Sequence, residues 1–117
     1  LINPLLVEEQ LRGAIVQGLG DALFEHCVYD DNSQLQNGTM VDYLVPMATE
    51  MPDITLAHVE TPSSASTLGA KGAGESGTAA APGTVFNAVN DALKPLDARV
   101  EAIPITPGDV IRAVGSR

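Results

Sequence analysis

The segment "GAKGAGESG", residues 69–77, is the feature that most limits how this chain can fold. Four of its nine residues are glycines, and they surround a single carboxylate, Glu75. Glycine weakens the interior of a helix or a strand, but it lets the backbone come close to a neighbouring element or a bound group. We therefore expect a loop here that lies against another element or a ligand.

Phosphate binding is the first interpretation of this loop. A Walker phosphate loop requires Ser or Thr directly after its G-K pair, and here Lys71 is followed by Gly72, which excludes that interpretation. Residues 72–77 do match G-x-G-x-x-G, a dinucleotide-binding pattern that requires a strand directly before it and an acidic residue about 20 positions later. Asp91 and Asp97 lie at loosely suitable distances, but "TPSSASTLGAK" separates the predicted strand from Gly72. The pattern thus matches in the glycines but not in the required strand, and we keep a small non-catalytic nucleotide-binding or interaction module as the alternative function.

Glu75 has two possible roles. At the start of a predicted helix, the helix dipole favours the ionised carboxylate, which is then ready to accept a proton from a substrate or a water molecule. The same carboxylate could instead be a solvated side chain that only stabilises the first turn of the helix. Spacing alone does not decide between an active-site base and a surface residue. Ser76 has no evident base partner, which argues against a serine nucleophile.

A long amphipathic helix is predicted over residues 4–25. Asn3 followed by Pro4 is a helix start signal, and apolar residues recur every four positions at Leu11, Ile15, Leu19 and Leu23. The opposite face is polar and rich in small residues: Gln10, Gly13, Ala14, Gln17, Gly20 and Asp21. Because glycine costs about 1 kcal/mol relative to alanine inside a helix, we expect another element to lie close against this helix. Arg12 falls within the apolar arc, where we expect it to pair with Glu8.

The remaining elements alternate between predicted strands and helices. Turn residues predict a hairpin with strands near 25–30 and 34–37, and further strands are predicted at 54–60 and 98–105. A second helix is predicted over about 78–94, ending at Pro95, and a short final helix after a cap at Thr106. The predicted fold is α+β, with two main helices packed on a small mixed sheet, in one unit spanning residues 1–117.

Composition excludes several classes of function. The chain carries 15 acidic and 6 basic residues, a net charge of −9, which argues against binding nucleic acid or an anionic membrane surface. No apolar run is long enough to span a bilayer. A single cysteine, Cys27, forms no internal disulfide and suits the cytoplasm; we expect it to be buried in a strand. His26 and His58 are expected to be core or surface residues, so no metal ligand is predicted.

Four segments together resemble one enzyme family. "GAKGAGESG" resembles the K-G-x-G-E motif near the C-terminus of the large, molybdopterin-binding subunit of the molybdenum hydroxylases, the superfamily of xanthine dehydrogenase, aldehyde oxidase and aerobic carbon monoxide dehydrogenase. "INPLLVEEQLRGAIVQGLGDALFE", "MVDYLVPMATEMPDI" and "VEAIPITPGDVIRAV" are similar to other segments of that subunit, in the same order. The resemblance covers nearly all 117 residues.

The resemblance implies a role for particular residues. It makes Glu75 the active-site base and places Lys71, Gly72, Ala73 and Gly74 against the cofactor. Gln10 would contact the pterin, with Gln17 a weaker candidate. Glu9 stands where the family usually has glycine, so its carboxylate is expected to turn away from the cofactor phosphates.

The resemblance also implies an activity and partners. The enzyme would oxidise an aldehyde, an N-heterocycle or a similar small substrate with oxygen derived from water. Its cofactor would be molybdenum–molybdopterin, in the cytosine dinucleotide form. Iron–sulfur clusters and FAD would be carried by an iron–sulfur subunit and a flavin subunit. Because the family's large subunit is several times longer, this chain would be its C-terminal segment and would be inactive without the remainder.

Overall fold

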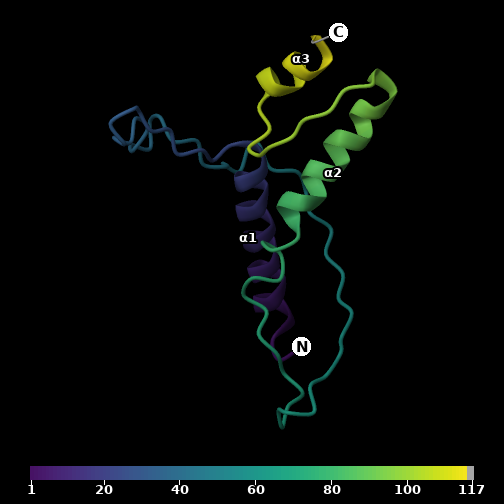
Figure 1. Ribbon diagram of the computed structural model, residues 1–117. Helices are drawn as coiled ribbons and strands as arrows, with labels where there is room; N and C mark the ends of the chain where they lie inside the picture. The colour runs from purple at the N-terminus through teal and green to yellow at the C-terminus, as the bar shows by residue number, and fades with distance from the viewer. Residues whose placement is uncertain (116–117) are drawn as a thin grey trace.

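Three α-helices and long irregular segments make up the part of the chain that the structure describes. The structure is a computed structural model that describes residues 1–115. The helices are α1 (Pro4–Leu23), α2 (Ala81–Leu93) and α3 (Pro107–Gly115), and the 3₁₀ turn η1 (Lys94–Leu96) follows α2 directly. Figure 1 shows α2 starting beside the middle of α1 and diverging from it, with α3 next to the far end of α2. Within this described part, no helix is both long and apolar enough to cross a bilayer.

Helix α1 begins as the sequence predicts. The Asn3 side chain accepts a hydrogen bond from the Leu6 N–H, so that it caps one of the free donors of the first turn. Pro4 occupies the first turn, where its missing N–H costs nothing. The helix ends at Leu23, because the Phe24 and Glu25 N–H groups both turn back to the Gly20 carbonyl.

Helix α2 is shorter than predicted. It begins at Ala81 rather than near residue 78, and residues 74–80 form a series of turns before it. Pro82 therefore lies in its first turn, where a residue without an N–H is tolerated. The turn that carries Glu75 is therefore separate from the helix.

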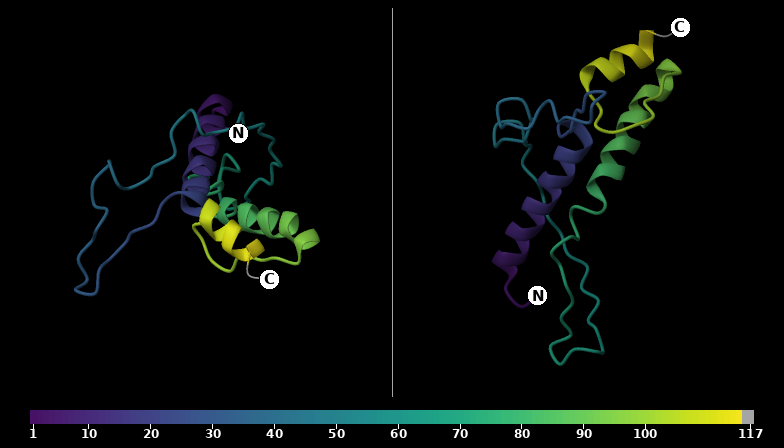
Figure 2. Two further views of the ribbon diagram at one scale, coloured as in Figure 1. Left: turned by 90° about the horizontal axis from the view of Figure 1, so that it is seen from above. Right: turned by 60° about the vertical axis from the view of Figure 1, so that its left-hand side comes forward.

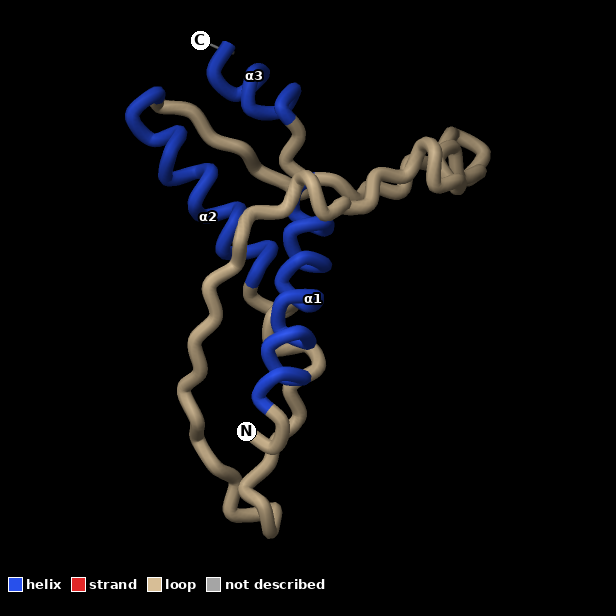
Figure 3. The backbone as a smooth tube through the Cα atoms, turned by 180° about the vertical axis from the view of Figure 1, so that it is seen from behind, coloured by secondary structure: helices blue, strands red, loops and turns tan. Residues whose placement is uncertain are grey.

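The predicted sheet is absent from residues 1–115. The only pairing of the hairpin at 25–37 is an isolated antiparallel bridge between Tyr29 and Leu35, and Figure 3 shows loop wherever strands were expected. Residues 54–60 and 98–105 are irregular as well. Strand-forming residues become strands only when another strand accepts their hydrogen bonds, and in two places a side chain accepts such a bond instead. The Val100 N–H, for example, donates to the Asn90 side chain.

A small apolar core lies between α2 and α3. Leu93, Val100 and Ile105 are buried there, and Ile105 is tied to the end of α1 by a bond from its N–H to the Ala22 carbonyl. At the start of α3, the Thr106 hydroxyl caps the Asp109 N–H while the Asp109 carboxylate accepts from the Thr106 N–H. The cap predicted at Thr106 is therefore confirmed.

Residues 24–50, here called the arm, extend away from the helices (Figure 2). The arm exposes large apolar side chains and the thiol of Cys27, so the prediction that Cys27 is buried in a strand is wrong. At its base the Tyr43 hydroxyl donates to Glu25 over 2.7 Å. This hydrogen bond to a carboxylate is the main reason why the pKa of Tyr43 rises to about 12.

Candidate functional site

The structure brings two of the predicted site segments together. The Gln10 side chain of α1 donates from Nε2 to the Gly74 carbonyl oxygen over 3.1 Å, across 64 residues of sequence. Both residues are exposed, and Gln10 lies on the polar face of α1 that the periodicity identified. The glycine loop therefore lies along α1 on the side of Gln10. Gln17, on the same face, is exposed, and its side chain makes no hydrogen bond to the loop within the described residues.

Glu75 follows Gly74 directly and is exposed. Its carbonyl oxygen accepts from the Ala79 N–H over 3.1 Å, so its backbone belongs to the turn that leads into α2. Within residues 1–115, no donor bonds to its carboxylate. Glu75 thus presents a carboxylate that is free to accept a proton.

Close packing holds the end of the loop against α1. A Cβ added at Gly77 would lie 2.9 Å from both the Ala14 Cβ and the Ile15 nitrogen, closer than real side chains come. The next residue, Thr78, donates its hydroxyl to the Ala14 carbonyl over 2.9 Å. Thr78 was not among the predicted site residues; a hydroxyl directly after the last glycine of the motif was the available signal.

A cavity of about 640 Å³ lies beside the loop. Lys71, Gly72 and Ala73 line it, opposite residues 57–62 and the start of α1. Gln10, Gly74 and Glu75 are not among its lining residues. The cavity therefore includes only three of the predicted site residues, Lys71, Gly72 and Ala73.

Two polar side chains that line this cavity differ in their hydrogen bonding: one has a partner and the other has none among the described residues. The Lys71 ammonium is exposed and donates to the Thr61 hydroxyl, and both residues line the cavity. His58 also lines the cavity, and its Nε2 is buried with no hydrogen-bond partner among the described residues. Buried polar atoms are normally satisfied, so this nitrogen is an exception within the described residues.

The loop presents free backbone donors. Among residues 1–115, no acceptor receives the backbone N–H groups of residues 70–75. A Cβ added at Gly72 or Gly74 would meet nothing within 4 Å, so both backbones are open to a close approach. Consecutive free N–H groups are suitable donors to phosphate and carbonyl oxygens.

Glu9 is paired with Arg12 of its own helix. The Arg12 Nε lies 3.6 Å from its carboxylate, and the Arg12 Nη1 also donates to the Ile54 carbonyl over 2.7 Å. The sequence prediction that Arg12 pairs with Glu8 is therefore wrong. Arg12 instead joins Glu9 to the segment around Asp53, 3.9 Å away.

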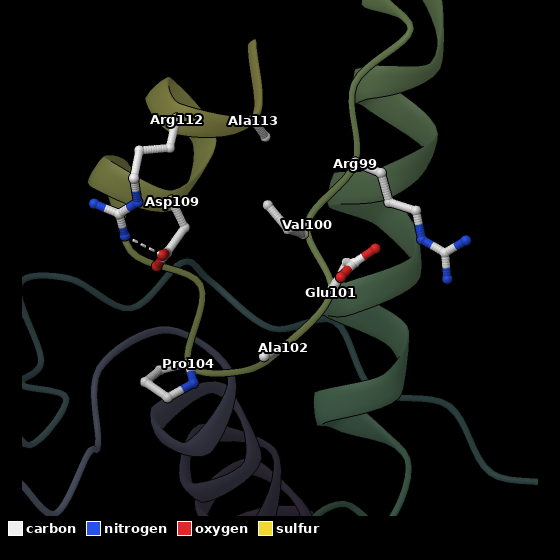
Figure 4. A pocket seen from close by; sticks show the side chains of 8 residues that line it. All are labelled: Arg99, Val100, Glu101, Ala102, Pro104, Asp109, Arg112 and Ala113. Carbon is white, nitrogen blue, oxygen red and sulfur yellow. Dashed lines mark hydrogen bonds and ion pairs between the residues drawn. The ribbon is translucent and has the colours of Figure 1, made fainter. Parts of the chain in front are cut away.

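A second cavity, of about 410 Å³, lies between residues 99–104 and α3. In Figure 4 the Val100 and Ala113 side chains face each other, Arg99 extends away from α3, and Asp109 binds Arg112. Hydrogen bonds from Thr106, with a further contribution from Arg112, lower the pKa of Asp109 to about 2. A carboxylate committed to a helix cap and an ion pair is a poor acid or base near neutral pH, so this cavity is not a candidate active site.

Two alternative sites find no support in the described residues. No group of three or more His, Cys, Asp or Glu side chains there could hold a metal ion. The G-x-G-x-x-G interpretation requires a strand directly before Gly72, and the chain from residue 51 to the loop forms none.

Comparison with known proteins gives consistent matches. Residues 1–52 match the family described as the molybdopterin cofactor-binding domain. The chain is 45% identical over 113 residues to the nicotine 6-hydroxylase large subunit of Paenarthrobacter nicotinovorans, which covers 97% of this chain and 14% of that protein.

Solved structures match over the whole chain. The structure of quinoline 2-oxidoreductase from Pseudomonas putida 86 matches with a TM-score of 0.95 and 46% identity, over 100% of this chain and 15% of that one. A CO dehydrogenase from Oligotropha carboxidovorans matches with a TM-score of 0.91 and 29% identity, over 98% of this chain and 14% of that one. The chain thus spans about one seventh of the length of these relatives.

Proposed function

Because the chain belongs to the molybdenum hydroxylases, as part of their molybdopterin-binding large subunit, we propose that Glu75 is the active-site base of a molybdenum-dependent oxidoreductase. The contact between Gln10 and Gly74 carries this proposal, since it joins the two segments expected to meet the cofactor directly beside an exposed carboxylate. Residues 1–117 would be the C-terminal segment of the catalytic domain, as the resemblance implies.

The loop and α1 would form one wall of the cofactor site. The free N–H groups of residues 70–75 would bind oxygens of molybdopterin, in its cytosine dinucleotide form. Gln10 would contact the pterin while it holds the Gly74 carbonyl. When bound, the cofactor supplies the two-electron redox chemistry; the chain supplies the wall and the base.

Glu75 would move a proton. Its carboxylate would take the proton of the water-derived nucleophile, so that the oxygen can attack an electron-poor carbon of the substrate. A carboxylate without another donor within the described residues is available for this step. Glu9 does not compete, because Arg12 holds it.

The substrate would be a nitrogen heterocycle. The names of two relatives that are 45% and 46% identical refer to nicotine and quinoline, both N-heterocycles, whereas the CO dehydrogenase is 29% identical. Activity would require the remainder of the large subunit, together with an iron–sulfur subunit and a flavin subunit that carry electrons away. We expect this assembly in the cytoplasm.

The test is Glu75→Gln in the full enzyme that contains this chain, assayed with quinoline and nicotine. Removing a general base costs about 10²–10⁴-fold in kcat/KM. We expect a loss of that size with unchanged molybdenum and pterin content. Glu101→Gln, an exposed glutamate beside the second cavity, serves as the control and should keep full activity. Full activity in Glu75→Gln would contradict the proposal.

A further inference from the structure

Thr78 makes a contact that its place in the sequence does not explain. Its hydroxyl donates to the Ala14 carbonyl in the middle of α1, over 2.9 Å and in a partly buried position. A threonine shortly before a helix usually caps that helix. Here the N-cap of α2 is Ala80, which makes no side-chain cap bond. The Thr78 hydroxyl therefore does not cap α2 but forms a hydrogen bond to α1.

The residues around Thr78 leave little freedom for movement. Gly77 lies so close to Ala14 and Ile15 that a single added carbon would overlap with them. Ala14 itself is only 5% exposed. Because threonine is branched at Cβ, its side chain also has few rotamers. The Gly77–Thr78 pair is therefore fixed against one turn of α1.

This fixed pair is connected to Glu75 through the backbone. The Ala79 N–H donates to the Glu75 carbonyl over 3.1 Å, and the Ala81 N–H donates to the Gly77 carbonyl over 3.3 Å. On the other side of Glu75, Gln10 holds the Gly74 carbonyl. Among the described residues no donor bonds to the Glu75 carboxylate, so only its backbone fixes its position.

Within residues 75–80 of the described chain, Thr78 has the only side chain that bonds to α1. The Ser76 hydroxyl, by comparison, returns to the Ala73 carbonyl inside the loop. The turn would keep its local hydrogen bonds without Thr78, but its direction relative to α1 would depend on packing alone.

We propose that Thr78 is a positioning residue for Glu75. Its bond to the Ala14 carbonyl holds the turn of residues 73–79 on α1, so that the carboxylate stands at one place relative to the face of Gln10. The inference depends on the proposed role of Glu75. A displacement of about 1 Å at a reacting group can lower the rate by up to about 100-fold. A hydrogen bond that prevents such a displacement of Glu75 would therefore contribute measurably to kcat.

The test uses Thr78→Val in the full enzyme, because valine keeps the shape and removes the hydroxyl. We expect kcat to fall between about tenfold and 100-fold with KM within about twofold. Hydrogen exchange at the Ser76 and Ala79 amides should become about two- to tenfold faster, as expected for one lost hydrogen bond. Molybdenum content should not change. Thr78→Ser, which restores the hydroxyl, should recover kcat to within about threefold.

Thr84→Val is the matched control. The Thr84 hydroxyl donates to the Ala80 carbonyl within its own helix, so this variant removes the same kind of bond without releasing α1. We expect unchanged kcat and unchanged exchange in residues 73–79. If Thr78→Val does not assemble, Thr78→Ala and Thr78→Ser are compared in its place.

Three results would overturn the inference: kcat unchanged in Thr78→Val, kcat lost without faster exchange in residues 73–79, or no recovery in Thr78→Ser. The proposed function is judged separately by Glu75→Gln. If Glu75→Gln loses activity and Thr78→Val keeps it, only the positioning role fails. If Glu75→Gln keeps activity, the role of Glu75 as base fails, and the positioning role fails with it.

Discussion

Gln10 is the residue at which helix and loop meet, and its amide can be tested alone. Gln10→Leu removes the bond to the Gly74 carbonyl and keeps most of the side-chain volume. One such bond is worth about 0.5–1.5 kcal/mol, so we expect two- to tenfold faster exchange of the Ser76 amide, which donates to the Ala73 carbonyl in this loop. We also expect the full enzyme to retain less molybdopterin, since the pterin contact proposed for Gln10 would be lost as well.

Gln17→Leu is the comparison, because it removes an amide from the same face of α1 that does not reach the loop. Loop exchange should stay at the wild-type rate. Equal exchange rates in the two variants would show that the Gln10 contact contributes nothing to holding the loop.

Sequence reasoning predicted the position of a residue on its own element better than its contacts with distant segments. The four-residue period placed Gln10 on the polar face of α1, where the structure has it exposed, because that depends on a local pattern. Arg12 was paired with Glu8 by helix spacing, yet it binds Glu9 and the Ile54 carbonyl. The position of residue 54 depends on how the chain returns to α1, which no local pattern contains.

Small residues decide how close α1 and α2 come, and two glycines of α1 allow a matched test. A Cβ added at Gly18 would lie 2.6 Å from the Ala81 Cβ and 3.0 Å from Pro82, whereas one added at Gly13 meets nothing within 4 Å. We expect Gly18→Ala to destabilise the large subunit by about 1–3 kcal/mol through overpacking. Gly13→Ala should stabilise α1 by about 0.5–1 kcal/mol, because alanine is the better helix former.

Denaturant unfolding of the two variants and the wild type measures both effects. The two substitutions differ only in position along one helix, so opposite signs would isolate the contact between α1 and α2. Two stabilising substitutions would contradict the close approach at Gly18.

Helices were predictable from sequence and strands were not, for one physical reason. A helix satisfies its backbone within itself, so the cap at Asn3 and the four-residue period were enough to predict α1. A strand needs a partner, and the strand-like segments 54–60 and 98–105 find none among the described residues. The hairpin prediction was right about the turn, where Tyr29 meets Leu35, and wrong about the ladder.

The molecule as a whole is more extended than a compact domain. Its radius of gyration is 18.0 Å, with extents of 56 × 39 × 29 Å, against about 13 Å expected for a globular domain near this length. Only five apolar residues are buried within the described chain. The arm and residues 51–73 leave the helices and expose side chains such as Met40, Val41 and Val59. With so few buried apolar residues, we expect this fold to depend on contacts with protein outside these 117 residues.

The 117-residue chain expressed alone should therefore unfold without a sharp transition. A cooperative domain of this length would show a calorimetric enthalpy of roughly 80 kcal/mol, and we expect a far smaller and broader signal. Leu93→Ala sharpens the test, because Leu93 is 5% exposed in the small core. Inside the full large subunit it should cost about 2–5 kcal/mol, whereas in the isolated chain it should change little, since no cooperative core is there to lose. A sharp transition that Leu93→Ala shifts downward would mean that these residues form a stable unit by themselves.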